Sequence, residues 1–297
     1  MPTIFTLASG RSGTSYLAEF FKHNILNCYS THEPYLDPWN PTLFGKPILY
    51  NTLGDPRLEI TLDKKQKRIK QLNKGNYFES NHAFLKTAHQ HGGDLFEDMG
   101  LIHLVRDPRQ VAKSELNREL LINKLKLPWI RYQGPNNLRL FKWSLTGLEE
   151  IYKAVTLPTI SRFQFYVLQW IEIENRAMQF IQQNSLAERC IHLHVPEAFT
   201  DVNNLRSLAA FFDLKLVEKP RLELRTNQTP FVGSNKLSAQ EENEFNQVIR
   251  SLPLQYRFIF REPPYQQYHW AQNLLPDFKS NYGPTNQRAT LATNMPR

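Results

Sequence analysis

The sequence of 297 residues is 41% hydrophobic and 22% charged, a composition typical of folded globular proteins that excludes a largely disordered chain. Its formal net charge of +8 favours an anionic partner, such as nucleic acid, an acidic glycan, a membrane surface or a phosphorylated nucleotide. Two cysteines, Cys28 and Cys190, are too few for a disulfide framework or a cysteine-based metal site. We therefore expect two buried thiols in a reducing compartment.

The N-terminus lacks the basic and long apolar segments of a signal peptide. No apolar run approaches the ~20 residues that a membrane helix needs, so we expect no integral membrane segment. The first motif begins at Ala8, and on that ground we also expect no membrane anchor before it. These features together predict a cytoplasmic protein.

Short apolar runs alternate with helical patterns along the chain, which is typical of parallel βαβ construction. We predict an α/β fold like that of the P-loop nucleoside triphosphatases, with a central parallel sheet of about four to five strands flanked by helices. We expect one domain over residues 1–275, followed by a polar C-terminal tail over residues 276–297. The expected strands are residues 3–8, 76–80, 101–105 and 190–195, and the first helix is residues 15–22.

Two segments are distinctive in composition. Residues 63–74 are strongly basic, which indicates either a solvated helix face or an electropositive approach surface for an acidic acceptor. Residues 115–185 read as helical and rich in aromatic side chains. Most of these aromatic residues belong to a core by default, and some could line a pocket for an acceptor.

The first motif is the segment ASGRSGTS at residues 8–15, between a predicted strand and a predicted helix. Its two glycines allow positive φ and a close approach of the backbone, so successive N–H groups can form an anion nest. The helix N-terminus adds free N–H groups and the positive end of a dipole. Arginine adds a charged fork, and the hydroxyl groups add donors. The candidate anion-binding residues are Gly10, Arg11, Ser12, Gly13, Thr14 and Ser15.

This loop differs from the nucleotide-binding loop of nucleoside triphosphatases. Thr14 follows Gly13 where those proteins have the lysine that reaches the β- and γ-phosphates. An accidental glycine-rich turn before a helix is the structural alternative.

The second motif follows the predicted strand at residues 101–105. Asp107 is a good N-cap, Pro108 suits the first helical position, and Gln110 has the spacing of a capping box. The strand therefore turns into a helix at Arg106. Ligands of open parallel sheets bind outside the carboxyl ends of the strands, so Arg106 lies at the expected ligand edge. Ser114 follows about two helical turns later, ~10 Å along the axis, where it could share one phosphate with Arg106.

A strand that ends in an acid could instead hold magnesium in a nucleoside triphosphatase. We discount that alternative because Asp107 is better used as a helix cap and because the first loop has no lysine.

Together, the two motifs resemble those of the sulfotransferases that use 3′-phosphoadenosine 5′-phosphosulfate (PAPS). Residues 10–14 look like the family's 5′-phosphosulfate loop, in the Arg-Ser-Gly form of tyrosylprotein, carbohydrate and bacterial members. Arg106 and Ser114, eight residues apart, match its 3′-phosphate pair. Residues 196–199 and the amphipathic run 205–214 resemble the element after the fourth strand, so the resemblance covers roughly residues 3–250. Cytosolic members also grip the 3′-phosphate with an Arg-Lys-Gly segment, for which Lys236 is a candidate substitute.

The resemblance implies transfer of a sulfuryl group from PAPS to a hydroxyl of a small-molecule, glycan or lipid acceptor, leaving PAP. Such chemistry resembles phosphoryl transfer, in which catalysis is mostly positioning and electrostatics. The leaving phosphate has low basicity, so a cation near the bridging oxygen suffices, and Arg11 is the candidate. The chemistry requires no metal, and the sequence shows no metal-ligand spacing.

Two residues compete for the role of base toward the acceptor hydroxyl. Glu33 precedes Pro34 in a context similar to the proposed base of bacterial and carbohydrate members, and His82 follows the second predicted strand, where cytosolic members have a histidine. Glu33 is favoured as the general base because it accompanies the Arg-Ser-Gly loop, although a neutral histidine is also well suited to accept a proton. The structural alternatives are a surface turn for Glu33 and a loop or core histidine for His82. His32 is expected to pack or orient.

Three other functions agree with parts of the sequence. A P-loop kinase would need the missing lysine and a magnesium-binding acid. A non-catalytic module that binds PAP or an acidic ligand would keep the anion-binding residues and leave Glu33 and His82 idle. A nucleic-acid binder is suggested by charge alone, without any recognised binding motif, so we expect no nucleic-acid partner. The sequence leaves the acceptor and the oligomeric state open.

Overall fold

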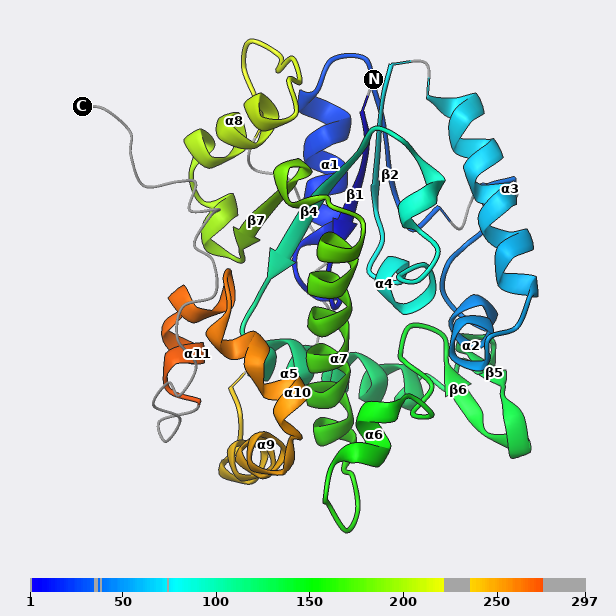
Figure 1. Cartoon of the computed structure of the whole chain (residues 1–297), viewed down its shortest axis with the longest axis vertical. Helices are drawn as coiled ribbons and strands as arrows, with labels where there is room; N and C mark the ends of the chain where they lie inside the picture. The colour runs from blue at the N-terminus through cyan, green and yellow to red at the C-terminus, as the bar shows by residue number, and fades with distance from the viewer. Residues whose placement is uncertain (1, 35–36, 38, 74, 222–235, 275–297) are drawn as a thin grey trace.

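The computed structural model describes residues 2–34, 37, 39–73, 75–221 and 236–274 (Figure 1). Within these residues a central sheet of five parallel strands has the order β2-β3-β1-β4-β7. This arrangement confirms the predicted α/β fold class with a parallel sheet between helices. The strands are β1 (Thr3–Leu7), β2 (Cys28–His32), β3 (Asn76–Ser80), β4 (Met99–Val105) and β7 (Cys190–His194).

The sequence did not predict β2. Its residues, Cys-Tyr-Ser-Thr-His, form no apolar run, and β2 lies at an edge of the sheet, where it pairs with β3. An edge strand is half covered, so its side chains need not be apolar on both faces. The four predicted strands all form, with boundaries that differ from the prediction by at most two residues.

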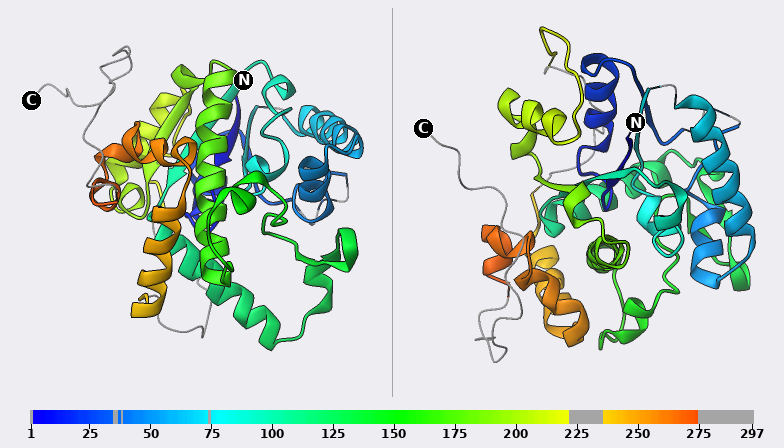
Figure 2. Two further views of the ribbon diagram at one scale, coloured as in Figure 1. Left: turned by 60° about the horizontal axis from the view of Figure 1, so that its bottom comes forward. Right: turned by 45° about the horizontal axis from the view of Figure 1, so that its top comes forward.

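Alternate side chains of the strands enter two separate cores. Ile4, Ile102 and Leu104 pack beneath helices α1 (Thr14–Asn24) and α8 (Val202–Phe211). Phe5, Leu101 and Val105 face the larger core on the other side of the sheet. Figure 2 shows α1 and α8 on one side of the sheet and α7 on the other. The helices that contribute to the larger core include α2 (Lys46–Leu53), α3 (Arg57–Leu72), α4 (Phe84–Thr87), α5 (Pro108–Lys124), α7 (Arg162–Gln183) and α9 (Ala239–Ser251).

The strand order creates a switch point between β1 and β4. The chain leaves β1 toward β2 and β3 on one side, and leaves β4 toward β7 on the other. Loops that diverge in this way open a crevice at the carboxyl ends of the two strands, where open α/β sheets bind ligands. Both predicted anion-binding motifs follow these two strands.

The expectation that residues 115–185 are helical is only partly right. Helices α5 and α7 occupy much of this segment, but an antiparallel ribbon, β5 (Arg131–Gln133) and β6 (Arg139–Phe141), lies between them. The turn of the ribbon carries Asn136 and Asn137 at positive φ, a conformation that asparagine tolerates. The remaining helices here and beyond are α6 (Glu150–Ala154), α10 (Leu254–Arg257) and α11 (His269–Gln272). Short 3₁₀ segments are Gly93–Leu95, Pro128–Ile130, Pro135–Asn137, Ala187–Arg189, Glu197–Phe199, Phe258–Arg261 and Tyr265–Gln267.

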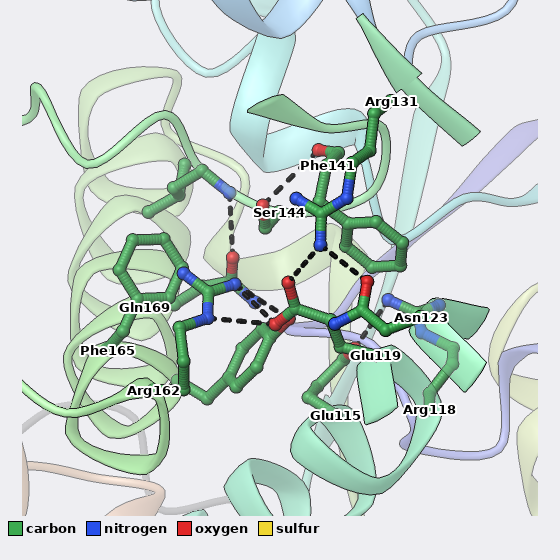
Figure 3. A network of polar contacts seen from close by, with 12 residues as sticks. Glu115, Arg118, Glu119, Asn123, Arg131, Phe141, Ser144, Arg162, Phe165 and Gln169 are labelled. Atoms are coloured by element: carbon green, nitrogen blue, oxygen red, sulfur yellow. Dashed lines mark hydrogen bonds and ion pairs between the residues drawn. The ribbon is translucent and has the colours of Figure 1, made fainter. Parts of the chain in front are cut away.

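An ion-pair network centred on the buried Glu119 of α5 ties the ribbon to α7 (Figure 3). Its carboxylate lies 2.7 Å from Arg131 Nη2 of β5 and 2.6 Å from Arg162 Nη2 of α7, and it accepts a 2.8 Å hydrogen bond from the Tyr166 hydroxyl. Burial would raise the pKa of Glu119, but the neighbouring Arg162, Tyr166 and Arg131 outweigh it and hold the pKa below its ordinary value. The network therefore stays ionised and fixes three elements together.

The basic segment at residues 63–74 lies mostly on α3. Lys64, Lys67 and Lys70 are exposed, as a solvated helix face predicts. Lys65 is an exception: it is buried, 2.8 Å from Glu79 of β3. Lys74 and the predicted tail at residues 276–297 lie outside the described residues. Among the described helices none has the length and apolar character needed to cross a bilayer.

Replacing Lys65 by methionine is expected to lower the free energy of unfolding by about 3–5 kcal/mol, because Glu79 would keep a buried charge without its cation. Urea unfolding measures this change. The matched variant Lys64→Met removes an exposed lysine one residue away and should change stability by less than ~0.5 kcal/mol. Equal effects of the two variants would contradict the buried pair.

Candidate functional site

The loop between β1 and α1 has the backbone of an anion nest. Gly10, Arg11 and Gly13 have φ values of 98°, 54° and 83°. Gly13 is the N-cap of α1, and no side chain caps the helix there. Ser12 Oγ donates a 2.9 Å hydrogen bond to the Gly10 carbonyl and closes the loop on itself. The N–H groups of the loop and of the helix N-terminus therefore point toward one region, an arrangement typical of phosphate-binding sites.

Glycine is required at position 13 for a second reason. A Cβ there would lie 2.3 Å from Phe199 Cε2. Phe199 belongs to the 3₁₀ turn Glu197–Phe199 after β7 and stacks on Tyr16 of α1 with ring centroids 4.6 Å apart. The segment at residues 196–199 therefore packs directly against the anion-binding loop.

The first motif forms a corner between β1 and α1, and the second motif forms a corner between β4 and α5. This second corner is built largely as the sequence predicts. Asp107 Oδ1 accepts a 2.9 Å hydrogen bond from Arg109 N, and Pro108 begins α5. The predicted capping box is wrong, because the Gln110 side chain accepts a 3.2 Å hydrogen bond from Arg106 Nη2 instead. Gln110 thus helps to hold the arginine at the carboxyl end of β4.

The two corners meet. Arg106 Nη1 donates a 2.6 Å hydrogen bond to the carbonyl oxygen of Arg11, and Arg11 Nε donates a 2.9 Å hydrogen bond to Ser114 Oγ. Burial is the main cause that lowers the pKa of both arginines, yet a guanidinium remains protonated. Arg106 Nε is buried without a hydrogen-bond partner among the described residues. A buried donor in this state needs an acceptor, which an anionic ligand would supply.

Thr14 and Ser15 begin α1 beneath the loop. Thr14 is buried. Ser15 Oγ lies 3.2 Å from His32 Nε2, and His32 Nδ1 lies 2.9 Å from Ser80 Oγ. His32 therefore links α1 to the ends of β2 and β3. Lys236 begins a described segment, whereas residues 233–235 of the suggested 3′-phosphate element lie outside the described residues.

The two candidate bases contact each other. Glu33 follows β2 and His82 follows β3, and neighbouring strand ends bring Glu33 Oε1 and His82 Nδ1 into direct contact with both side chains buried. Burial alone would raise the pKa of Glu33, but His82, His32 and Arg118 hold it well below its ordinary value. Burial lowers the pKa of His82, which Glu33 partly offsets. The Glu33 carboxylate is therefore ionised and accepts a hydrogen bond from Nδ1 of the neutral His82 imidazole.

His82 Nε2 is left buried and without a hydrogen-bond partner in the described part of the chain, and so is Glu115 Oε1. Both side chains lie against Gly10. A Cβ on that glycine would be 2.7 Å from Glu115 Oε1 and 3.1 Å from His82 Cδ2. The nest, the imidazole and the carboxylate therefore surround one small region, and any side chain at position 10 would enter it.

Sequence reasoning missed Glu115. It follows Ser114 on α5 and pairs with Arg118, whose guanidinium lies 5.3 Å from the centroid of the Trp143 ring. Lys86 of α4 is fully buried and donates a 2.5 Å hydrogen bond to the Trp143 carbonyl. Burial lowers its pKa to about 8, with Glu115 opposing. The sequence feature that could have pointed to Glu115 is its spacing from Arg118, one helical turn later, directly after Ser114.

Two surface hollows, with volumes of about 580 and 330 Å³, contain none of these residues. The larger lies at the amino ends of β2 and β3, near Cys28 and Asn76, and the smaller lies between α2 and α7, near Asn51 and Arg176. Among the described side chains, no group of three or more His, Cys, Asp and Glu residues is placed to hold a metal ion.

Three solved structures are similar to this chain. The sulfotransferase domain of the Synechococcus PCC 7002 olefin synthase is 15% identical with a TM-score of 0.45, over 73% of this chain and 75% of that one. The sulfotransferase domain from the curacin biosynthetic pathway is 15% identical with a TM-score of 0.46, over 93% and 96%. A sulfotransferase from Alicyclobacillus acidocaldarius is 13% identical with a TM-score of 0.46, over 83% and 90%. No protein-family model and no curated protein matches the sequence. At identities this low, the function of the protein has to be argued from the residues of its site.

Replacing Gly13 by alanine is expected to destabilise the protein more than replacing Gly54 by alanine. Both glycines have positive φ, at 83° and 64°, so both variants lose roughly 1–2 kcal/mol to backbone strain. A Cβ at position 54 meets nothing within 4 Å, whereas one at position 13 collides with Phe199 and adds about 1–3 kcal/mol. Denaturant unfolding measures both. Equal losses would contradict the tight contact between the loop and Phe199.

Proposed function

We propose that this protein is a PAPS-dependent sulfotransferase that transfers a sulfuryl group to a hydroxyl of a small-molecule, glycan or lipid acceptor. The observation that carries the proposal is the junction of the two motifs, where Arg106 Nη1 donates to the Arg11 carbonyl at 2.6 Å. A donor nucleotide with phosphates at both its 3′ and 5′ positions needs two adjacent anion sites. A loop nest and a separate arginine–serine pair fit that need.

The residues present fit such a donor. The nest around residues 10–13 and the N-terminus of α1 suit the 5′-phosphosulfate. Arg106, with its unpartnered buried Nε, and Ser114 suit the 3′-phosphate. When bound, the donor supplies a sulfuryl group on a phosphate leaving group of low basicity. Arg11 then contributes a fixed positive charge beside the loop, where charge develops on that leaving group.

We assign the base to His82 and a positioning role to Glu33. The ionised Glu33 carboxylate can only accept, so His82 Nδ1 carries the proton and Nε2 keeps its lone pair. This Nε2 atom is buried and unpartnered in the described structure, beside Gly10 of the loop. A carboxylate whose pKa lies well below its ordinary value is a weak base, whereas a neutral imidazole is well suited to take a proton from a hydroxyl. The two residues therefore have different roles: His82 accepts the proton, and Glu33 holds the His82 ring in place.

The kinase alternative is weakened by the state of Asp107. Its carboxylate caps α5 through Arg109 N and also lies 2.7 Å from Arg109 Nη2, so it is engaged on both oxygens. A magnesium-binding acid would need at least one available oxygen. The alternative of a non-catalytic PAP-binding module is separated from an enzyme by transfer of labelled sulfate to a pool of hydroxyl acceptors.

A reducing compartment such as the cytoplasm is part of the proposal. It is supported by the two cysteines, Cys28 and Cys190, which are both free thiols. Cys190 is buried as expected, whereas Cys28 lies on the edge strand β2 and is only partly buried, so the expectation of two buried thiols is wrong for Cys28. Burial raises the pKa of each to about 12, so neither is a reactive thiolate near neutral pH.

The variant His82→Ala is expected to lose about 10²- to 10⁴-fold in the rate of sulfate transfer, with PAP affinity nearly unchanged. Glu33→Gln should also lose rate, because His82 Nδ1 loses its charged acceptor. Transfer of labelled sulfate and calorimetric PAP binding measure the two quantities. His89→Ala removes a partly buried histidine that lies outside the cluster, at the smaller hollow, and is the control. Full rate in His82→Ala would contradict its assignment as the base.

The pH profile separates the base from its positioning partner. Burial lowers the pKa of His82, so the base form persists below pH 6.5 and rate is lost only as the pH falls through that lowered value. Glu33 raises the pKa of His82, so Glu33→Gln should move the acidic limb to lower pH. An acidic limb that stays in place in Glu33→Gln would show that Glu33 does not act through His82.

Arg106→Ala is expected to weaken PAP binding by about 10- to 100-fold, because it removes charged hydrogen bonds to the 3′-phosphate. Arg109→Ala is the matched control, since Arg109 pairs with Asp107 and packs over the Phe245 ring. Calorimetry with PAP should detect less than about a twofold change for the control. An unchanged dissociation constant in Arg106→Ala would remove Arg106 from the donor site.

A further inference from the structure

Residues 120–142 expose an unusual concentration of large apolar side chains. Leu120, Leu125, Trp129 and Leu138 are 54%, 55%, 61% and 44% exposed. They lie at the end of α5, in the connection that follows it, and in the turn of the β5–β6 ribbon. Four such side chains within 19 residues of sequence are a local concentration of exposed apolar groups, unlike single residues scattered over an ordinary surface.

The same segment carries five cationic residues and no acid. Lys124, Lys126 and Arg139 are exposed. Lys142 Nζ lies 5.7 Å from the centroid of the Trp129 ring, so a cation and the most exposed aromatic side chain of the patch lie together. We call this surface the apolar-basic tip, which consists of Leu120, Lys124, Leu125, Lys126, Trp129, Arg131, Leu138, Arg139 and Lys142.

The tip is held in place from beneath. Arg131 Nη2 bonds both Glu119 and Asn123, at 2.7 and 2.8 Å, which fastens the ribbon to α5 (Figure 3). Ile130 and Phe141 are buried at its base. Figure 2 shows the end of α5 and the chain that follows it at the edge of the molecule. The exposed apolar groups are thus presented outward by a fixed support.

An anionic bilayer surface fits this tip better than a second copy of the chain does. A two-fold interface would bring the patch against itself and set cations against cations. A binding peptide would need a groove, and neither described hollow is lined by residues of the tip. A membrane interface accepts protruding leucine and tryptophan side chains without a complementary shape, and anionic headgroups attract the lysine and arginine side chains around them.

We propose that the apolar-basic tip docks this protein on an anionic membrane surface, with Trp129 and the leucines in the interface and the cations at the headgroups. Docking would bring the candidate site near the bilayer. Phe141 at the base of the tip lies under the Arg118 guanidinium, 5.4 Å from it, and Arg118 pairs with Glu115. Docking itself does not depend on sulfuryl transfer, because it is measured without donor or acceptor.

The test is co-sedimentation with vesicles of phosphatidylcholine alone and of phosphatidylcholine mixed with phosphatidylglycerol. The protein should bind the mixed vesicles, release them as salt is raised, and bind phosphatidylcholine weakly. Each cation near an anionic surface contributes about fivefold in affinity, so Lys124→Gln with Lys126→Gln should bind about 25-fold more weakly. Trp129→Ser should bind about tenfold more weakly.

Two controls match these changes. Lys64→Gln with Lys67→Gln removes the same charge from the exposed face of α3, and Trp39→Ser removes a tryptophan that is 75% exposed outside the tip. Both should bind as the unaltered protein does, and an unchanged thermal unfolding midpoint in every variant reports an intact fold. Equal binding to both kinds of vesicle, no binding to either, or equal loss in tip and control variants would overturn the proposal. So would a dimer that Trp129→Ser converts to a monomer.

Discussion

The hydrogen bond from Arg106 to the carbonyl oxygen of Arg11 joins the two corners on which the proposed site depends. The bond links loops that leave β1 and β4 in opposite directions, so it spans the base of the crevice that this strand order opens. It also turns the carbonyl of residue 11 toward a cation, which is compatible with backbone N–H groups of the same loop facing an anion. Without this contact the loop nest and the arginine would be two separate anion sites.

Several buried polar groups near this junction lack hydrogen-bond partners among the described residues. Glu119 and the Lys65–Glu79 pair, which lie outside it, are matched closely by their neighbours. At the junction, Arg106 Nε, His82 Nε2 and Glu115 Oε1 are buried without partners among the described residues. Such groups destabilise a fold unless a ligand completes them. Two of them, His82 Nε2 and Glu115 Oε1, belong to side chains that lie against Gly10, as a site for a hydrogen-bonding ligand requires.

Both corners could be predicted from sequence because each depends on local chemistry: glycines and hydroxyls before a helix, and an aspartate–proline pair after an apolar strand. Contacts between distant residues could not. The contact between Glu33 and His82 cannot be predicted, because nothing in the sequence says that β2 and β3 are neighbours. Strand β2 is itself hard to predict, because an edge strand needs no apolar run. The β5–β6 ribbon was missed because its short strands lie between strongly helical segments. Glu115 was hidden for a similar reason, since a glutamate on a helix is usually solvated.

The central claim is that two neighbouring anion sites hold two phosphates of one nucleotide. It is tested most directly by comparing the affinities of PAP and of adenosine 5′-monophosphate, which lacks the 3′-phosphate, for the unaltered protein and for Arg106→Ala. Calorimetry should show that the unaltered protein binds PAP at least tenfold more tightly than the monophosphate, and that Arg106→Ala removes most of this difference. Equal affinities in the unaltered protein, or a difference that survives in Arg106→Ala, would contradict the claim.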